Sequence, residues 1–579
     1  MRIRLERYSL VDKFFELIER QRPSDRLIMR SLFFIIIGTG IYFLLSLNNE
    51  YSVSVPTDGG SITEGIVGIP RFINPALAIT RADQDTTALV YSGLLRIGED
   101  GNLNPDLAES VSVSDDGLTY RAVLKKNQFF HDGTEVKADD VIFTVELIKN
   151  PDLKSPLRGN WNDVTVEKIN DYELNFVLKE AYSPFIENFT IGIMPQHIWG
   201  SLPIEQLPFS QYNTEPIGSG PFSIDTVHRD NSGLINGYTL KPEPSSQGKA
   251  SLDKIELRFF QNEDLLSTAF FKKEINSTVF LPPEKIAELD KDDVQIISQP
   301  LPRIFGIFLN QNRSPALRDK SARQALNVAV DREQLINEVL GGYGVPTTRP
   351  ILTTQDKLKL TNTDQANSST SSLNIAREIL VKGGWTQNNA GFWEKEIDKS
   401  VEILSITIRT SNTAVFDKTA TIVADNWRKL GVEVQIEQYE QTGLVQSVIR
   451  TRDFQALLFG LDMNRIQDLY PFWHSSQKDD PGLNISQYTN ITVDQLLEKA
   501  RTTTNETERQ EALTKISDII SEEIPAIFLF APNVTYVIDN DIKFTPISTF
   551  GKPSDRFMNI TTWHAKTETV WPIFREDNQ

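Results

Sequence analysis

The chain contains no cysteine among its 579 residues. This excludes disulfides, a thiol nucleophile, iron–sulfur clusters and cysteine-based zinc sites, as well as the modified cysteine that anchors lipoproteins. Histidine is scarce, and no two histidines lie three or four residues apart, so the helical pair of a metal site is missing. We therefore predict no metal and no cofactor. The five histidines are His131, His197, His228, His474 and His564.

Positive charge is also in short supply. The chain has 59 Lys and Arg against 78 Asp and Glu, a net charge of -19. The first 30 residues are net positive, with eight basic and five acidic side chains, so the acidity belongs to the rest. An acidic body repels a phosphate backbone, which argues against nucleic-acid binding. Solubility is the plain explanation of the charge.

Residues 31–47 form a long apolar run, SLFFIIIGTGIYFLLSL, which indicates a membrane segment. Its 17 uncharged residues reach the lower limit for crossing a bilayer. Four arginines precede it, at positions 20, 22, 26 and 30, whereas the next thirty residues contain only Arg71. The positive-inside rule then predicts one membrane-spanning anchor, with the N-terminus in the cytoplasm and the bulk of the chain outside.

A cleaved signal peptide is the alternative interpretation of this run. The 30 residues before it are too many for a signal peptide, and the only cleavage site in view is a weak one at Ser52 and Ser54. We favour the retained anchor. Residues 1–30 are then a cytoplasmic segment and residues 48–56 a tether.

The rest of the chain mixes helical and extended patterns. Residues 137–149 open with two aspartates and continue with apolar residues at helical spacing, whereas residues 171–180 alternate as a strand does. Residues 416–430 have one apolar face, and Gly431 ends this predicted helix just before the strand-like VEVQIE. This mixture predicts an α/β or α+β protein. Since one core stops growing near about 250–300 residues, the length predicts several domains.

Several stretches together resemble one family. Residues 90–148 contain NPDLAESVSVSDDGLTYRAVLKKNQFFHDGTEVKADDVIF, and residues 216–222 read PIGSGPF. Residues 305–350 contain RQALNVAVDREQLINEVLGGYG, and AREILVKGGW and NWRKLGVEVQI follow at 376–385 and 426–436. In this order and spacing they are similar to the bacterial extracellular solute-binding proteins of family 5, the oligopeptide, dipeptide and nickel class of ABC importers.

The resemblance implies a two-lobed clamshell of the periplasmic-binding-protein type, type II with an extra inserted domain. Lobe I would comprise residues 57–87, 218–300 and 531–579, the inserted domain residues 88–217, and lobe II residues 302–530. The implied function is capture of peptides or peptide-like solutes by lobe closure, as a monomer, followed by delivery to permease and ATPase subunits. A membrane-tethered sensor or scaffold and a surface hydrolase are the alternatives, and neither enzyme chemistry nor a cofactor is expected.

The resemblance also implies binding residues. In peptide-binding members, an aspartate in a "GW.aDy.dP" segment receives the ligand ammonium, because a buried unpaired charge is costly. The matching stretch here, FGLDMNRIQDLYPFW, places Asp462 at this position after Phe459 and Gly460, with Asp468 as second candidate. This segment departs from the family pattern at two points: Phe459 replaces the tryptophan, and MNRIQ replaces the usual continuation.

The remaining candidates have plain structural alternatives. Asn74 lies in an "NP" turn that the family has near the cleft entrance, and Tyr470 and Trp473 would line a side-chain pocket or belong to the core. We expect Gly218 and Gly220 to form a turn at a hinge, and His131 and Asp132 to be structural. The sequence His474-Ser475-Ser476 suggests hydrolysis only superficially, because neighbours in sequence are expected to face apart.

Overall fold

The computed structural model describes residues 22–51, 53–352, 369–463, 465 and 467–570. The chain divides into two compact units, residues 1–59 with 566–579 and residues 60–565, which we describe separately. Most of the predicted cytoplasmic segment, residues 1–30, lies outside the described residues.

The smaller unit holds one long helix and one strand pair. Helix α2 (Pro23–Tyr51) contains the predicted apolar run, and β1 (Val53–Thr57) pairs antiparallel with β23 (Lys566–Val570). A search limited to the described residues finds no helix with both the length and the apolarity required for a membrane span. The helix predicted over 31–47 is therefore present, but the structure gives the predicted membrane anchor no support.

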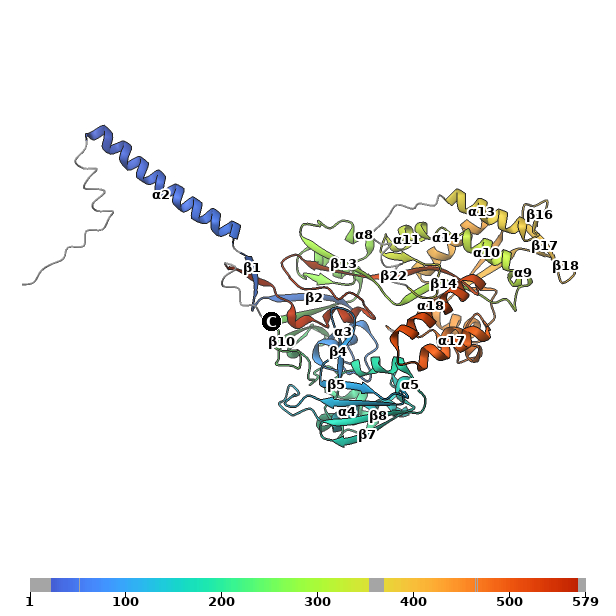
Figure 1. The fold of residues 1–579 in the computed structure, drawn as a ribbon, viewed down its shortest axis with the longest axis horizontal. Helices are drawn as coiled ribbons and strands as arrows, with labels where there is room; N and C mark the ends of the chain where they lie inside the picture. The colour runs from blue at the N-terminus through green and yellow to red at the C-terminus, as the bar shows by residue number, and fades with distance from the viewer. Residues whose placement is uncertain (1–21, 52, 353–368, 464, 466, 571–579) are drawn as a thin grey trace, which may run out of the picture. The chain divides into compact units, whose positions relative to one another are not determined.

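A twelve-stranded mixed sheet runs through the larger unit (Figure 1). Its central strand, β22, has 14 residues; its first part pairs with β14 and its last part with β13 and β12. β22 thus joins the two halves of the sheet. The order is β20 (Glu433–Tyr439), β19 (Ser405–Ser411), β21 (Ala456–Asp462), β14 (Arg303–Leu309), β22 (Ala526–Asp539), β12 (Ser277–Thr278), β2 (Ser61–Val67), β11 (Lys254–Phe260), β10 (Ile235–Pro242) and β9 (Phe222–Arg229), with β13 (Val294–Pro300) and β15 (Gly344–Pro346) paired to β22.

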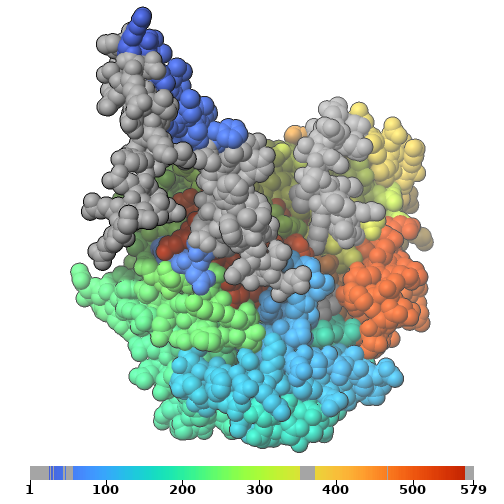
Figure 2. Space-filling model, turned by 60° about the vertical axis from the view of Figure 1, so that its left-hand side comes forward, coloured from blue at the N-terminus to red at the C-terminus, as the bar shows by residue number. Residues whose placement is uncertain are grey.

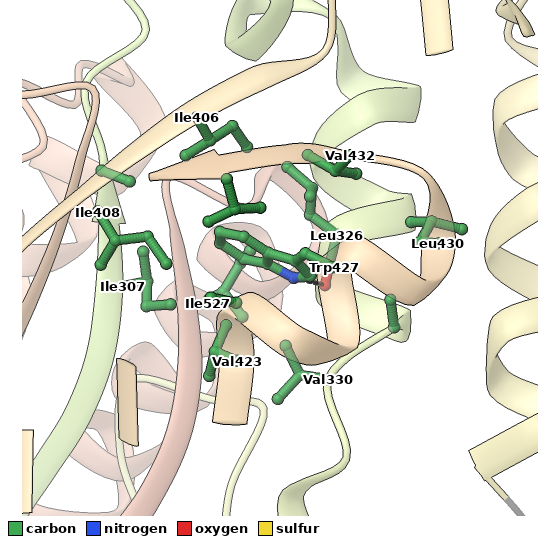
Figure 3. Packing of buried hydrophobic residues seen from close by; sticks show 14 of the residues in the cluster. Ile307, Leu326, Val330, Ile406, Ile408, Val423, Trp427, Leu430, Val432 and Ile527 are labelled. Carbon is green, nitrogen blue, oxygen red and sulfur yellow. Dashed lines mark hydrogen bonds between the residues drawn. The ribbon is translucent and has the colours of Figure 1, made fainter. Parts of the chain in front are cut away.

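One half of the sheet, from β20 to β14, is packed against helices around a buried tryptophan (Figure 3). Trp427 is fully buried, and its indole N–H donates a 3.0 Å hydrogen bond to the carbonyl of Leu326. Gly431 ends the helix of Trp427 in the left-handed conformation, at φ 101°, as the sequence predicts. The helices in this core are α10 (Lys320–Val328), α11 (Arg332–Leu340), α13 (Ser369–Lys382) and α14 (Ala414–Leu430).

A second core lies against β14, β21 and the first part of β22. It contains the fully buried Trp473, which packs against the rings of Phe308 and Phe528. The helices here are α16 (Tyr470–Trp473), α17 (Ile491–Thr502) and α18 (Glu506–Glu523).

The other half of the sheet, from β2 to β9, has its own core and a buried ion cluster. Arg556 pairs with Glu64 at 2.7 Å and with Asp85 at 2.8 Å, and all three side chains are withdrawn from solvent. Burial is the largest influence on Glu64 and raises its pKa, although Arg556 opposes this effect. The helices on this side are α3 (Arg81–Val90), α7 (Glu263–Phe271) and α8 (Pro283–Ile286), with the short 3-10 helix η8 (Pro553–Phe557).

A separate core lies between residues 76 and 207 and contains a four-stranded antiparallel sheet. Aromatic rings from Tyr120, Trp161, Phe176, Phe185 and Phe189 pack against one another there. The predicted helix over 137–149 and the predicted strand over 171–180 are both confirmed. The elements are β5 (Ala108–Val113), β6 (Thr119–Leu124), β8 (Glu173–Leu178), β7 (Val164–Asn170) and α4 (Ala138–Lys149), with α5 (Arg158–Trp161), η2 (Ser183–Thr190), β3 (Leu95–Ile97) and β4 (Leu103–Pro105) beside them.

Candidate ligand-binding cavity

A cavity of about 410 Å³ lies within the larger unit, between the 76–207 core and the half of the sheet that contains β2. Its walls come from distant stretches of sequence: residues 75–106, 157–192, 221–247 and 551–558, together with Arg465. The charged side chains that line it are balanced, with three carboxylates and three basic groups. They are Asp106, Glu187, Asp555, Arg96, Arg465 and Lys552.

Arg465 reaches this wall from the loop that follows β21 (Ala456–Asp462). Its Nη1 donates a 2.8 Å hydrogen bond to the carbonyl of Thr549, and its Nη2 binds the carboxylate of Asp555. Its Nε lies 3.7 Å from Oε1 of Glu187. The side chain is only 12% exposed. Through these three contacts, one guanidinium joins the loop after β21 to both other walls of the cavity.

Asp555 is fully buried at the start of η8. Its Oδ2 accepts the backbone N–H groups of Gly551, at 2.8 Å, and Lys552, at 3.0 Å, as well as the bond from Arg465. Its Oδ1 is equally buried but accepts no hydrogen bond from the residues that the structure describes. One carboxylate oxygen is therefore saturated while the other is unused.

Asp106 is the second buried carboxylate of the cavity. Burial raises its pKa, and hydrogen bonds from Ser246 and Gln247 together with the charge of Arg96 oppose this shift. The amide nitrogen of Gln247 donates to Asp106 at 3.3 Å, and the amide oxygen of Gln247 has no donor among the described residues. Like Oδ1 of Asp555, this oxygen is a buried acceptor in a residue that lines the cavity.

A second contact joins the 76–207 core to the part of the chain that contains α17. Tyr182 donates a 3.2 Å hydrogen bond to Oδ2 of Asp468, which also accepts a 3.0 Å bond from Nε of Arg501. The guanidinium of Arg501 lies 4.8 Å from the ring centre of Tyr182 and 4.2 Å from that of Tyr470, so it sits against one ring from each side. Figure 2 shows the cyan surface of residues near 100–150 and the orange surface near 490–520 on the same face.

The predicted residue Asp462 lies at the end of β21. Its side chain is 60% exposed and forms an ion pair with Arg303 on the adjacent strand β14. Gly460 faces the ring of Phe305, and Phe459 stacks against Phe416 with ring centres 6.4 Å apart. These three predicted residues therefore form a surface of their own beside β14, and none of them is among the described residues that line the cavity.

The other four predicted residues also lie outside the described lining. Asp468 and Tyr470 belong to the contact with Arg501, and Tyr470 stacks on His474 with ring centres 4.1 Å apart. Trp473 is enclosed in the second core. Asn74 is buried, and its amide nitrogen donates to Asn213 at 3.3 Å, while the next residue, Pro75, does line the cavity.

Sequence reasoning missed the charged residues of the cavity. Arg465 was visible only as part of MNRIQ, the departure from the family pattern, and its lone charge gave no partner. Asp555 stands in KPSDRF, where Pro and an aspartate two residues later indicate the start of a short helix. A capping signal predicts a local turn and contains no information about which cavity the turn faces.

The structural role expected for His131 is visible in its contacts. Nε2 lies 3.0 Å from the carbonyl oxygen of Gly220, which fixes this nitrogen as the donor, and Nδ1 accepts the backbone N–H of Gly218 at 3.3 Å. Burial lowers the pKa of His131, although the bond to Gly220 and nearby carboxylates oppose the shift. His131 therefore fastens the predicted hinge turn to the hairpin around Asp132.

One expectation about the His474 segment is wrong. Ser476 does not face away, since its hydroxyl lies 2.8 Å from Nδ1 of His474. The reason is local: His474 caps the short 3-10 helix η7 (Ser475–Gln477), so Nδ1 also accepts the backbone N–H of Ser476 at 3.1 Å. Neither residue is among those described as lining the cavity. In the part of the chain that the structure describes, no cluster of side chains has the make-up of a metal site.

The fold and the cavity can now be compared with known proteins. The family described as bacterial extracellular solute-binding proteins, family 5, middle region, matches residues 102–482, more than half of the chain. The chain belongs to this family. Among family-5 relatives, the oligopeptide-binding protein AppA of Bacillus subtilis is 29% identical over 499 residues, which cover 83% of this chain and 88% of AppA. Di/tripeptide-binding protein 3 of Pseudomonas aeruginosa is 26% identical, over 83% of this chain and 92% of its own length.

Solved structures agree with the family assignment. B. subtilis AppA in complex with a nonapeptide matches with a TM-score of 0.63 and 27% identity, over 88% of this chain and 99% of that one. NikZ of Campylobacter jejuni in complex with Ni(L-His) matches with a TM-score of 0.64 and 25% identity, over 88% and 100%. The mixed α/β periplasmic-binding-protein fold predicted from the sequence is therefore confirmed, and the chain is a solute-binding protein of an extracytoplasmic family that serves ABC importers.

Proposed function

We propose that this protein captures peptides or peptide-like solutes in the 410 Å³ cavity and delivers them to the permease and ATPase of an ABC importer. The observation that carries the proposal is the charge balance of the cavity wall, which contains three carboxylates and three basic groups. A peptide in water carries one ammonium and one carboxylate, so it matches a wall of mixed charge. The volume also lies within the range of about 300–1,000 Å³ that is usual for small-ligand sites.

Closure of two lobes would supply the capture step. Enclosing a ligand removes water from it and strengthens every polar contact made inside. Two contacts connect the parts that would have to separate: the ion pair of Arg465 with Asp555, and the hydrogen bond that Tyr182 donates to Asp468. The proposed division places residues 302–530 in one lobe and residues 57–87, 218–300 and 531–579 in the other, with 88–217 as an inserted domain.

The proposal also includes the location. The family places the ligand-binding unit outside the cytoplasmic membrane. On sequence grounds alone, we propose that residues 31–47 anchor it as a single pass, with the N-terminus inside. Alkaline carbonate extraction of membranes that contain the full chain tests this: the chain should stay in the pellet, and its release into the supernatant would contradict the anchor.

Native mass spectrometry of the purified full chain tests the function. We expect peptide adducts after incubation with a tryptic digest of casein, and their release on mild collisional activation. The matched control is the heat-unfolded chain, which has no cavity. A folded chain that takes up no peptide from the digest would reject the proposal.

A further inference from the structure

The charged groups of the cavity wall differ in how far the protein itself already engages them. All three carboxylates have partners: Asp106 accepts two hydrogen bonds from side chains, and Asp555 accepts three bonds through its Oδ2. Glu187 lies 3.7 Å from Nε of Arg465, which also binds Asp555. The negative charges of the wall and the guanidinium of Arg465 are therefore used within the protein.

Arg96 is a cation of the same wall in a different situation. It is the middle residue of β3 (Leu95–Ile97), it lines the cavity, and it is half-buried. Its charge acts on the buried Asp106, but its side chain forms no ion pair or hydrogen bond with any residue that the structure describes. Since a guanidinium carries five N–H donors, a group with oxygen acceptors can still bind here.

Such a state is rare among the arginines of the larger unit. In the described part of residues 60–565, Arg81 and Arg96 are the two half-buried arginines whose side chains form neither a hydrogen bond nor an ion pair. Arg71 lacks such a bond as well, but it is exposed to solvent. Arg81 lies on the same face of α3 as Gln84 and Ala88, which both line the cavity. The half-buried cations without a partner thus lie in the cavity wall or beside it.

A carboxylate is the chemical group that suits Arg96 best. The planar guanidinium matches the two oxygens of a carboxylate and binds them through two parallel hydrogen bonds. Taking a cation partly out of water costs free energy unless a partner compensates it, and a carboxylate supplies both the opposite charge and the acceptors. An amide oxygen supplies an acceptor without the charge, so Arg96 should distinguish an acid from its amide.

We propose that Arg96 binds a carboxylate of the captured solute. This inference rests on the proposed function, because it specifies which chemical group of the solute the β3 wall receives. Both the C-terminal carboxylate of a peptide and an acidic side chain have this chemistry. Arg96 lies in the proposed inserted domain, residues 88–217, so this domain would take part in selecting the solute.

The experiment compares two peptide mixtures on the full chain. One is a tryptic digest of casein, and the other is the same digest with its carboxyl groups converted to amides, which removes their charge and changes their size little. The substitution Arg96→Gln removes the cation but keeps a polar side chain. The matched control is Arg121→Gln, which removes the same charge from the surface, where Arg121 pairs with Glu173. Thermal melting confirms that each variant is folded.

We expect the unmodified chain to bind the untreated digest about tenfold more tightly than the amidated one, and Arg96→Gln to lose this preference while Arg121→Gln keeps it. Equal binding of both digests by the unmodified chain would overturn the inference and leave the proposed function intact. If Arg96→Gln kept the preference, the carboxylate would bind elsewhere and the inference would be wrong. Binding of neither digest would overturn both.

Resynthesis of one captured peptide distinguishes the two sources of the carboxylate. One version ends in an amide, and the other has Asn or Gln in place of each Asp or Glu. Weaker binding of the first version assigns the C-terminus to Arg96, and weaker binding of the second assigns an acidic side chain. Either result supports the inference when the loss disappears in Arg96→Gln. Unchanged binding of both versions would contradict it.

Chemical modification tests Arg96 without any variant. Phenylglyoxal reacts with the guanidinium groups that it can reach, and peptide mapping by mass spectrometry measures the reaction at each arginine. The untreated digest should slow the reaction at Arg96 and the amidated digest should not, whereas the exposed Arg71 should react at one rate throughout. An Arg96 that reacts equally fast with and without bound peptide would overturn the inference, even if Arg96→Gln does not fold.

Discussion

Tyr182 donates a hydrogen bond to Asp468, a residue 286 positions further along the chain, and this bond joins the 76–207 core to the part that contains α17 (Ile491–Thr502). Burial, followed by the negative charge of Asp468, raises the pKa of Tyr182, so its hydroxyl stays protonated and donates. In a clamshell, such a contact forms when the lobes close and breaks when they open. The Tyr182–Asp468 bond should therefore influence how long a captured solute is retained.

The substitution Tyr182→Phe tests this role. It removes the hydroxyl but keeps the ring beside Arg501, so only the hydrogen bond is lost. A hydrogen bond to a charged group contributes roughly 1.5–3 kcal/mol. Because water takes over part of this interaction with Asp468 when the hydroxyl is removed, we expect peptide to dissociate about two- to tenfold faster. Stopped-flow dissociation kinetics measures this rate.

The matched control for this substitution is Tyr172→Phe. The hydroxyl of Tyr172 donates a 2.8 Å bond to Glu135 within the 76–207 core, so its loss does not touch the contact with Asp468. The dissociation rate of Tyr172→Phe should equal that of the unmodified chain. Identical rates in both variants would show that the Tyr182 bond plays no part in retention.

His131 should make stability depend on pH. Burial lowers its pKa below the ordinary 6.5, so between the two values the unfolded chain binds more protons than the folded one. Above about pH 6.5 the neutral ring contributes its full amount to the free energy of unfolding. This contribution is lost as the pH falls from there through the lowered pKa of His131 in the folded chain. Protonation would also place a second N–H at Nδ1, opposite the backbone N–H of Gly218.

Urea denaturation between pH 7.5 and pH 5 measures this effect. The free energy of unfolding of the unmodified chain should fall more steeply with acid than that of His131→Gln, so the difference between the two shrinks toward low pH. His564→Gln, a change in a half-buried histidine that leaves the contacts of His131 intact, is the control and should keep the steep slope. A difference that stays constant across this range would rule out the titration of His131.

The buried cluster of Arg556 with Glu64 and Asp85 should be necessary for stability. Arg556→Met keeps most of the volume but leaves two buried carboxylates without a cation, which costs about 3–5 kcal/mol. Arg121→Met is the control, because the pair of Arg121 with Glu173 is on the surface and contributes about 1 kcal/mol or less. Equal urea midpoints for the two variants would contradict the prediction.

Features encoded by adjacent residues were predictable from the sequence, whereas contacts between distant residues were not. The helix over 416–430 and its end at Gly431 are predicted correctly, because apolar spacing and a glycine stop are written in adjacent residues. The cavity wall is different: Arg465 meets Asp555 across 90 residues, and no periodicity relates them. The family motifs predict the fold correctly, whereas Asp462 pairs with Arg303 outside the described lining of the cavity, so the binding role predicted for it stays a prediction.

The turn that contains Gly218 lies at the junction between the 76–207 core and the sheet, and it packs closely against the end of α3. A Cβ atom at Gly218 would lie 2.0 Å from the carbonyl oxygen of Val90, which is backbone and cannot move aside cheaply. The same turn is held by His131, whose backbone N–H donates to the carbonyl of Gly218 at 2.8 Å. Gly218→Ala must therefore displace the end of α3 (Arg81–Val90) or break the fastening at His131.

We expect Gly218→Ala to lower the free energy of unfolding by about 1–3 kcal/mol, the usual cost of overpacking. Gly443→Ala is the matched control, since a Cβ atom there meets nothing within 4 Å and alanine favours a helix by about 1 kcal/mol over glycine. Gly443→Ala should thus be neutral or slightly stabilising in urea denaturation. If Gly218→Ala were as stable as Gly443→Ala, the close approach to Val90 would not be a constraint, and the turn would be free to move independently of α3.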